Sequence, residues 1–271
     1  MRKKLIIIIW IILYIVLLTL IVIYKTNDDT LLVISNVNSK STIVYDLVND
    51  NILYEENIHQ KMLPASLTKV LTALTAYKNI DLNKTILIDN RILKAIGSRM
   101  YLEVGDVITV EELLYGLILQ SGNDAAIALE YAYSDNPYDF IFKLNEEVKK
   151  LNLKNSYFNN SSGLDEENYN YTTTYDLAMI TKEAINYPFL KELLGTKYYK
   201  IKLENKTLSF KHKHKLIIIN DYFTGGKTGY TKKAGRTLVS IYEKNDVKLI
   251  IVTFNDPNDW KTHTYFAEKY S

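Results

Sequence analysis

The chain contains no cysteine, so neither a disulfide framework nor a thiolate metal site can support its fold. A chain without thiols needs no redox control, which suits an exported protein. Its four histidines are scattered, apart from the close pair His212 and His214. That pair lies among lysines, Lys211-His212-Lys213-His214-Lys215, a pattern typical of a solvated strand face. We therefore expect no metal site there.

A strong net charge is also missing. The formal net charge is +2, and Arg2, Lys3 and Lys4 contribute three positive charges, which leaves about −1 for the rest of the chain. This balance excludes the basic field that nucleic-acid binding requires. The hydrophobic fraction of 47% and the charged fraction of 24% are those of an ordinary globular protein. With 271 residues and no internal repeat, the chain can form one large domain or two small ones.

One segment has no charged residue at all. Leu5 to Tyr24 is a run of 20 residues, and at about 1.5 Å per residue a helix of this length spans the hydrocarbon core of a bilayer. The basic residues that precede it place the N-terminus in the cytoplasm and the body outside. We therefore predict a single-pass cell-membrane protein with a cytoplasmic tail (1–4), a signal-anchor (5–24), a linker (25–30) and an extracytoplasmic domain (31–271). A cleaved signal peptide is the alternative, but no small-residue cleavage site follows the run.

Strand-like segments lie at both ends of this domain and helical segments lie between them. Expected strands cover 31–35, 42–47, 52–55, 237–242 and 247–254, the last two as a hairpin. Expected helices follow Ser66 and cover 111–120, 124–133, 139–151, 173–184 and 261–270. The pattern is helical from Pro64 to about Leu194. We predict an α/β (α+β) fold in which one antiparallel sheet, built from both termini, carries an inserted helical block.

The first chemical motif is Ser66-Leu67-Thr68-Lys69. On a helix this spacing places Ser66 and Lys69 on one face. A serine hydroxyl needs a base within hydrogen-bond reach, and a lysine can serve only if its pKa is lowered by burial or by a second cation. The apolar segment from Val70 to Leu74 suggests burial, and Lys227 is the candidate second cation. Taken alone, however, a serine with a lysine three residues later is more often an exposed helix surface.

Two further motifs carry complementary groups. In Ser121-Gly122-Asn123, between two predicted helices, Ser121 can relay a proton and the Asn123 amide can bind a lysine and a substrate carbonyl. Gly122 permits a tight turn. Taken alone, this triplet also suits a loop with Asn123 as a helix N-cap.

The third motif is Lys227-Thr228-Gly229-Tyr230, which precedes a strand. An edge strand with small residues lets a substrate backbone pair alongside it. The N–H after Gly229 and the N–H of Ser66 could form an oxyanion hole. Taken alone, it also suits a glycine-rich hairpin turn.

The three motifs in this order are typical of penicillin-binding proteins and β-lactamases. From Leu31 to its end the chain resembles the low-molecular-weight penicillin-binding proteins of the D-alanyl-D-alanine carboxypeptidase family, with a β-lactamase/transpeptidase-like fold. The residues that carry this resemblance, besides the three motifs, are Pro64-Ala65, Gly97-Ser98-Arg99-Met100, Leu114-Tyr115-Gly116-Leu117, Asp124-Ala125-Ala126, Phe158-Asn159-Asn160, Gly163-Leu164-Asp165, Tyr171-Thr172-Thr173, Thr231 and Ala234-Gly235.

The resemblance implies roles for these residues. Ser66 attacks the D-Ala-D-Ala bond of a peptidoglycan stem peptide and Lys69 acts as general base. Ser121 and Asn123 assist proton transfer and positioning, while Lys227, Thr228, Gly229 and Tyr230 form the substrate-binding strand. β-Lactams are expected to acylate the same serine, and no metal or organic cofactor is expected.

The chain departs from the family pattern in two places. Many relatives carry a second β-rich domain and a C-terminal amphipathic anchor, and we expect the N-terminal segment to replace that anchor. Many also carry an arginine near the last strand that meets the substrate carboxylate. Here Lys261, His263 or Thr228 alone is expected to take its place.

Two alternatives stay open. A class A β-lactamase-like hydrolase would use Glu166 and Asn170, which have the required spacing. A non-catalytic penicillin-binding or wall-binding module would keep only the fold, although the intact Ser66, Lys69 and Lys227 argue against it.

Overall fold

The computed structural model describes residues 10, 12, 14–19, 37–165 and 169–271. The chain divides into two compact units, Met1–Asn38 and Ser39–Ser271, and the second is described here. Most of the predicted anchor 5–24 and the whole predicted strand 31–35 lie outside the described residues. Within the described ranges, no helix is both long and apolar enough to cross a bilayer.

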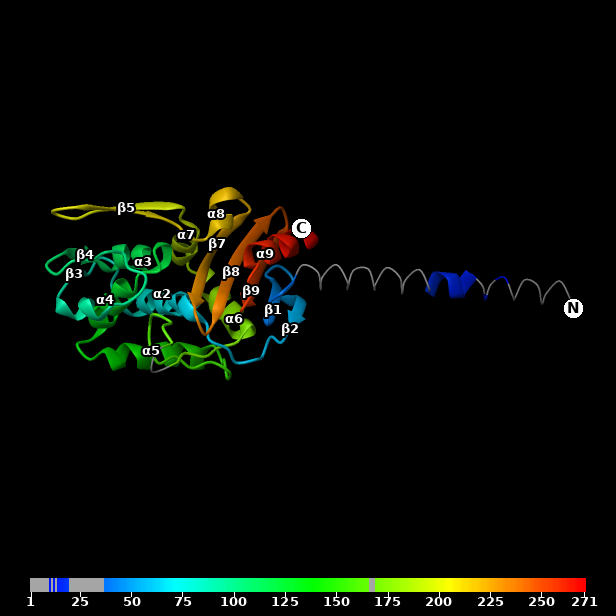
Figure 1. The fold of residues 1–271 in the computed structure, drawn as a ribbon, viewed down its shortest axis with the longest axis horizontal. Coiled ribbons are helices and arrows are strands. Elements are labelled where there is room, and N and C mark those ends of the chain that lie inside the picture. Colours follow the sequence, from blue (N-terminus) through cyan, green and yellow to red (C-terminus); the bar gives the residue numbers. More distant parts are fainter. Residues whose placement is uncertain (1–9, 11, 13, 20–36, 166–168) are drawn as a thin grey trace, which may run out of the picture. The chain divides into compact units, whose positions relative to one another are not determined.

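A five-stranded antiparallel sheet forms one side of the domain, and it combines strands from both ends of the chain (Figure 1). The strand order is β2-β1-β9-β8-β7. The strands are β1 (Ser41–Asp46), β2 (Asn51–Glu56), β7 (Phe223–Thr231), β8 (Gly235–Lys244) and β9 (Val247–Phe254). The prediction of one antiparallel sheet built from both termini is confirmed. β7 lies at the edge of the sheet, where one side of its backbone is free to bind another chain.

Both faces of the sheet are covered. Every residue of β1 is buried, as are the last six of β9, so side chains of both orientations are removed from water. Helix α6 (Thr174–Ile185) packs against β1 and β9, and α9 (Asp259–Lys269) packs against β8 and β9. Thr173 is the N-cap of α6, as the sequence predicted.

The inserted block is built around α2 (Thr68–Asn79). Its residues from Thr68 to Ala76 are all buried, and it contacts the other helices of the block. These helices are α3 (Val110–Leu119), α4 (Asn123–Tyr133), α5 (Pro137–Lys150) and α7 (Pro188–Gly195). The block also contains 3-10 helices η1 (Ala65–Leu67) and η2 (Asn90–Lys94), and a small hairpin of β3 (Thr85–Leu87) and β4 (Val107–Thr109). The expectation of continuous helical structure was therefore wrong over 85–109, because three-residue strands are too short to show a period-two pattern.

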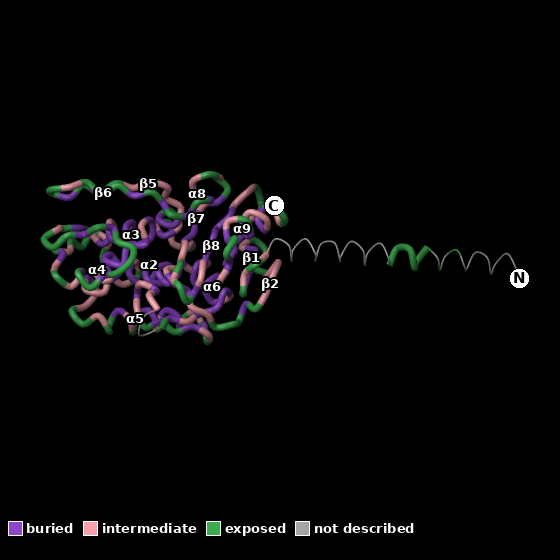
Figure 2. The backbone as a smooth tube through the Cα atoms, viewed as in Figure 1, coloured by how far each residue is buried: buried purple, intermediate pink, exposed green. Residues whose placement is uncertain are grey.

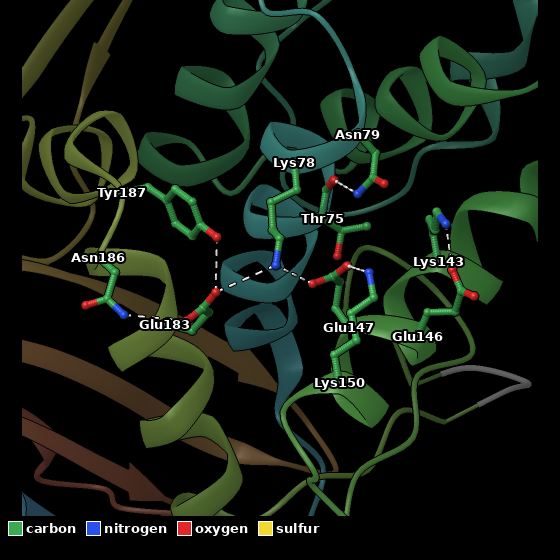
Figure 3. A network of polar contacts seen from close by, with 10 residues as sticks. All are labelled: Thr75, Lys78, Asn79, Lys143, Glu146, Glu147, Lys150, Glu183, Asn186 and Tyr187. Atoms are coloured by element: carbon green, nitrogen blue, oxygen red, sulfur yellow. Dashed lines mark hydrogen bonds and ion pairs between the residues drawn. The ribbon is translucent and has the colours of Figure 1, made fainter.

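An ion-pair network joins the end of α2 to α5 and α6 (Figure 3). Lys78 Nζ lies 2.7 Å from Glu147 Oε2 and 3.6 Å from Glu183 Oε1, and Lys150 Nζ lies 2.6 Å from Glu147 Oε1. Burial alone would raise the pKa of Glu147, but the hydrogen bonds from Lys150 and Lys78 outweigh it and lower that pKa. The charged Glu147 carboxylate of α5 is therefore paired with Lys78 of α2, and loss of that partner would leave a buried charge with less compensation.

A second hairpin, separate from the main sheet, runs beside α3 (Figure 1). It consists of β5 (Tyr198–Lys202) and β6 (Thr207–Lys211), and the short helix α8 (Lys215–Ile219) follows it. Strand character after Lys197 was predicted, and these two strands confirm it.

Candidate active site

Ser66 lies in η1, immediately before the central helix. Ala65 has a positive φ of 49°, and this turn brings the Ser66 side chain toward the first turn of α2. Lys69 belongs to that turn, and its Nζ lies 3.0 Å from Ser66 Oγ. The hydroxyl of Thr237 on β8 donates to the Pro64 carbonyl at 3.0 Å, which ties the turn to the sheet. The two side chains therefore meet as the spacing predicted.

The Lys69 amine has three oxygen neighbours. Besides Ser66 Oγ, they are Asn123 Oδ1 at 2.8 Å and the Ser162 carbonyl at 2.5 Å. Both of these can only accept a hydrogen bond. A neutral amine has two N–H groups, so when both are used on these oxygens its lone pair is directed at the Ser66 hydroxyl. This is the arrangement that a general base needs.

The electrostatic surroundings favour the neutral amine. Lys69 is fully buried, and its pKa is lowered to about 7, first by burial and then by the charge of Lys213, against an opposing effect of Asp124. Lys213 is thus a second cation near Lys69 that the sequence analysis had not named, in addition to its candidate Lys227. Burial, with the charges of Lys69 and Lys213, also holds the pKa of Lys227 well below its usual range.

The Ser-Gly-Asn motif lies between α3 and α4 and faces Lys69. Asn123 Nδ2 donates to the Ile96 carbonyl at 2.6 Å, which orients Oδ1 toward the lysine. The tight turn occurs at Ser121, whose φ is 58°, while Gly122 has a φ of −62° and is the N-cap residue of α4. A Cβ on Gly122 would lie 2.9 Å from Asp124 Oδ1, so the glycine serves a close approach and not a positive φ.

Asp124 secures the loop that lines the other side of this motif. Its buried carboxylate accepts hydrogen bonds from three successive backbone N–H groups, those of Met100, Tyr101 and Leu102, at 2.9–3.1 Å. The segment from Gly97 to Leu102 is thereby held against the start of α4. This explains why Asp124 accompanies the Ser-Gly-Asn triplet.

The Lys-Thr-Gly motif forms the middle of the edge strand β7. Lys227 Nζ donates to Ser121 Oγ at 3.0 Å and to the Thr228 carbonyl at 2.8 Å. Gly229 passes so close to η1 that a Cβ would lie 3.0 Å from Ser66 N and 2.3 Å from Thr237 Oγ1. A side chain there would push the strand away from Ser66, so only glycine suits this position.

The three motifs meet at one cavity of about 300 Å³. Its lining includes Ser66, Ser121, Thr228, Gly229 and Tyr230. Convergence of these segments was the central geometric expectation from the sequence, and it is confirmed. Lys69, Asn123 and Lys227 lie behind this lining and reach it through Ser66 and Ser121.

Sequence reasoning missed two cations on the cavity wall, Lys213 and Arg236. Lys213 Nζ donates to Ser98 Oγ at 3.2 Å, and the Arg236 guanidinium donates to both carboxylate oxygens of Asp259 at 2.8 and 3.0 Å. Lys261, expected to meet the substrate carboxylate, is not among the lining residues. The alternation of lysine and histidine from Lys211 to Lys215 is the sequence signal for Lys213, but it does not tell which side is buried.

The histidine interpretation was wrong. His212 and His214 are buried, and so is His263, which the sequence analysis had offered as a carboxylate ligand. His214 Nε2 and His263 Nδ1 both bond Ser240 Oγ, at 2.8 and 2.7 Å, so they link the sheet to α8 and α9. Burial lowers the pKa of all three rings. Among the described residues, no three metal-binding side chains are grouped to hold an ion.

The segment after α5 was recognised in sequence but given no role. Gly163, with a φ of +84°, passes so close to η1 that a Cβ would lie 1.8 Å from the Ala65 carbonyl oxygen. This contact places the Ser162 carbonyl beside Lys69. The Ser161 hydroxyl and backbone N–H donate to Glu130, whose pKa burial raises to about 7. A backbone carbonyl has no sequence signature, so the Ser162 contact could not have been predicted.

Asn170 also serves this segment. Its Oδ1 accepts the Asn159 N–H at 2.7 Å and its Nδ2 donates to Thr68 Oγ1 at 3.1 Å. The β-lactamase alternative required Glu166 as the base for deacylation, with Asn170 four residues later. Asn170 is instead bound to this loop and α2, and Glu166 lies outside the described residues.

Comparison with known proteins agrees with this geometry. The D-alanyl-D-alanine carboxypeptidase family (peptidase S11) matches residues 25–258. This chain belongs to that family. D-Alanyl-D-alanine carboxypeptidase DacF of Bacillus subtilis is 33% identical over 223 residues, which cover 80% of this chain and 57% of DacF. DacC of Escherichia coli is 32% identical over 241 residues, covering 83% of this chain and 58% of DacC. The chain thus spans little more than half the length of these curated family members.

Solved structures have the same fold. The D-alanyl-D-alanine carboxypeptidase of Mycobacterium tuberculosis H37Rv superposes with a TM-score of 0.80 and 26% identity over 85% of this chain and 89% of that chain. The Streptomyces K15 DD-transpeptidase superposes with a TM-score of 0.78 and 25% identity over 84% and 97% of the two chains. The predicted penicillin-binding fold is therefore confirmed.

Proposed function

We propose that the protein is a serine-type D-Ala-D-Ala carboxypeptidase that removes the terminal D-Ala from peptidoglycan stem peptides. The observation that carries this proposal is the Lys69 amine, which is held by two acceptor oxygens behind the cavity lining and lies 3.0 Å from Ser66 Oγ. The family's relatives are named for this activity. Because the chain covers only part of them, the assignment rests on the site geometry as well.

In the first half of the reaction, neutral Lys69 accepts the Ser66 proton as Oγ attacks the carbonyl carbon between the two D-alanines. The carbonyl electron pair moves onto oxygen, where the N–H groups of Ser66 and Tyr230 stabilise the charge. Collapse of this intermediate breaks the C–N bond. The departing amine takes the proton that Lys69 removed from Ser66, relayed through Ser121 Oγ, which leaves an ester on Ser66, free D-Ala and a neutral Lys69 again.

In the second half, Lys69 accepts a proton from water as the water oxygen attacks the ester carbonyl, and it returns that proton to Ser66 Oγ as the shortened peptide is released. The substrate backbone lies along the free edge of β7, where Thr228, Gly229 and Tyr230 line the cavity and Lys227 lies behind them. Asn123 keeps Lys69 directed at Ser66 throughout. A β-lactam acylates Ser66 in the same way and remains attached as a covalent inhibitor.

The test uses the full-length protein in detergent with a diacylated-lysine-D-Ala-D-Ala peptide. We expect stoichiometric release of D-Ala and, after penicillin treatment, a protein mass increased by one intact penicillin. A protein that releases no D-Ala and gains no mass would contradict the proposal. Rapid turnover of nitrocefin without a lasting adduct would point to a β-lactamase instead.

Residues 5–24 act in this proposal as an uncleaved membrane anchor, with 1–4 in the cytoplasm, 25–30 as linker and the catalytic domain 31–271 outside. The uncharged length of the run and the preceding basic residues support it. We expect the mature protein to keep Met1 or Arg2 and to stay with membranes after carbonate extraction. A mature N-terminus downstream of Tyr24, measured by mass spectrometry, would show that the segment is a signal peptide.

A further inference from the structure

The hairpin β5–β6 carries a lysine strip, which we define as Lys200, Lys202 and Lys211. The strand register pairs Tyr198 with Lys211, Lys200 with Ser209, and Lys202 with Thr207, so all six side chains share one face. Every one of these six residues is exposed. Figure 2 shows the exposed positions along this hairpin.

The opposite face of the hairpin prevents the strip from turning inward. Ile201 and Phe210 on that face are buried, and the Tyr199 ring stacks on Tyr115 of α3 with centroids 3.5 Å apart. Reversing the hairpin would expose this apolar face to water, at an appreciable cost in free energy. The fold therefore presents the lysines permanently to solvent.

The strip is not neutralised by neighbouring carboxylates. Residues 197–215 contain seven lysines and one acidic residue, Glu204. Lys197 pairs with Asp221 and Lys206 pairs with Glu103 and Asp106, whereas within the described part of the chain the strip lysines make no ion pair. Lysines of the helical block, such as Lys78 and Lys143, do have carboxylate partners. The positive charges of the strip repel one another, and binding of an external anion would relieve this repulsion.

The strip leads to the active site. From Thr207 to Lys215 every second residue is exposed, and the residues between them are buried except for the half-buried Leu208, so Lys213 continues the exposed side that carries Lys211. Lys213 lines the cavity that contains Ser66. At about 3.3 Å per residue, β6 extends for roughly 13 Å from Thr207 to Lys211, and Lys213 follows two residues later at the cavity.

We propose that the lysine strip binds a linear polyanion, a chain of phosphate or carboxylate groups, that runs along β5–β6 toward the cavity. A single file of cations fits an extended chain better than a bilayer, because this face offers only Tyr198 as a large apolar side chain. If the function proposed above is correct, the strip would hold an anionic wall polymer close to peptide being trimmed. The binding itself does not depend on catalysis.

The test measures binding of fluorescent long-chain polyphosphate to the full-length Ser66→Ala protein by anisotropy at several salt concentrations. We expect binding that weakens with salt. In the triple variant Lys200→Gln, Lys202→Gln, Lys211→Gln we expect affinity to fall at least about tenfold, and the slope of log K against log salt to fall by about two, because fewer counterions are released.

A matched triple variant provides the control. Lys40, Lys149 and Lys154 are exposed lysines outside the hairpin, and changing them to Gln should leave polyphosphate binding unchanged. Equal loss in both triples, no binding at all, or binding only to phosphatidylglycerol vesicles would overturn the proposal. Penicillin labelling of the strip variant with Ser66 intact shows that it folds. Absence of labelling and of D-Ala release in the unmodified protein would contradict the proposed function but not the strip.

Discussion

The Ser66→Ala variant is expected to form no covalent penicillin adduct and to release D-Ala at least about 10⁴-fold more slowly than the unmodified protein. Removing the nucleophile of a serine hydrolase costs several orders of magnitude, because no other group can form the acyl-enzyme. Ser121 is the other serine hydroxyl of the motifs, but its Oγ accepts from Lys227 at 3.0 Å and is not bonded to Lys69. It therefore should not substitute for Ser66.

Intact-protein mass after penicillin treatment and a D-Ala release assay measure the two effects. Ser134→Ala is a suitable control, since this half-buried serine caps the end of α4 opposite to Asn123 and its hydroxyl bonds Asp139 and the Asn136 N–H. It should keep full labelling. If the Ser66→Ala variant gained the same penicillin mass as the unmodified protein, another residue would be the nucleophile. Peptide mapping would then locate that residue.

The Lys69→Met variant is expected to lose about 10²–10⁴-fold in the rate of acylation by penicillin, the usual contribution of a general base. Methionine has a comparable length but no lone pair of the required basicity. In the unmodified protein the acylation rate should rise with pH and level off above a midpoint near 7, since burial and Lys213 lower the pKa of Lys69 to about 7 and only the neutral amine can accept the Ser66 proton.

The same shift predicts a stability effect with a definite sign. Between pH 7 and about 10.5 the unfolded chain binds a proton at residue 69 that the folded protein does not bind, so the free energy of unfolding should increase with pH in this window. The increase from this residue is on the order of a few kcal/mol. Denaturant unfolding of Lys69→Met should show a smaller increase over the same window.

Lys227→Met is the comparison variant for the acylation rate and pH profile expected of Lys69→Met. Its amine contacts Ser121 and not Ser66, so this variant should acylate slowly but retain the rise near pH 7. A flat pH profile in the unmodified protein, or an acylation rate in Lys69→Met within a factor of ten of it, would exclude Lys69 as the base.

Local sequence predicted the chemistry of this site because each motif is short and its geometry is set nearby. Ser66 and Lys69 are brought together within one turn of chain, and Gly229 allows β7 to approach Ser66. The sheet built from both termini was also predictable, since its strands show apolar segments separated by turns. The short strands β3 and β4 were not, because three residues carry too little periodic signal.

Other features depend on what covers each residue. The alternation from Lys211 to Lys215 is visible in sequence, but only the tertiary structure shows that the histidine side is buried and that Lys213 faces the cavity. The Ser162 carbonyl reaches Lys69 across 93 residues of chain, and a backbone atom leaves no trace in composition.

The sequence by itself therefore determined which groups we propose to react: Ser66, Lys69 and the residues of the two companion motifs. The tertiary structure brought the charge of Lys213 near Lys69, where it lowers the pKa of the amine, and it placed the Ser162 carbonyl where it orients that amine. The physical reason is that reactive groups are encoded by side-chain identity. Burial and long-range contacts arise only when distant segments pack together.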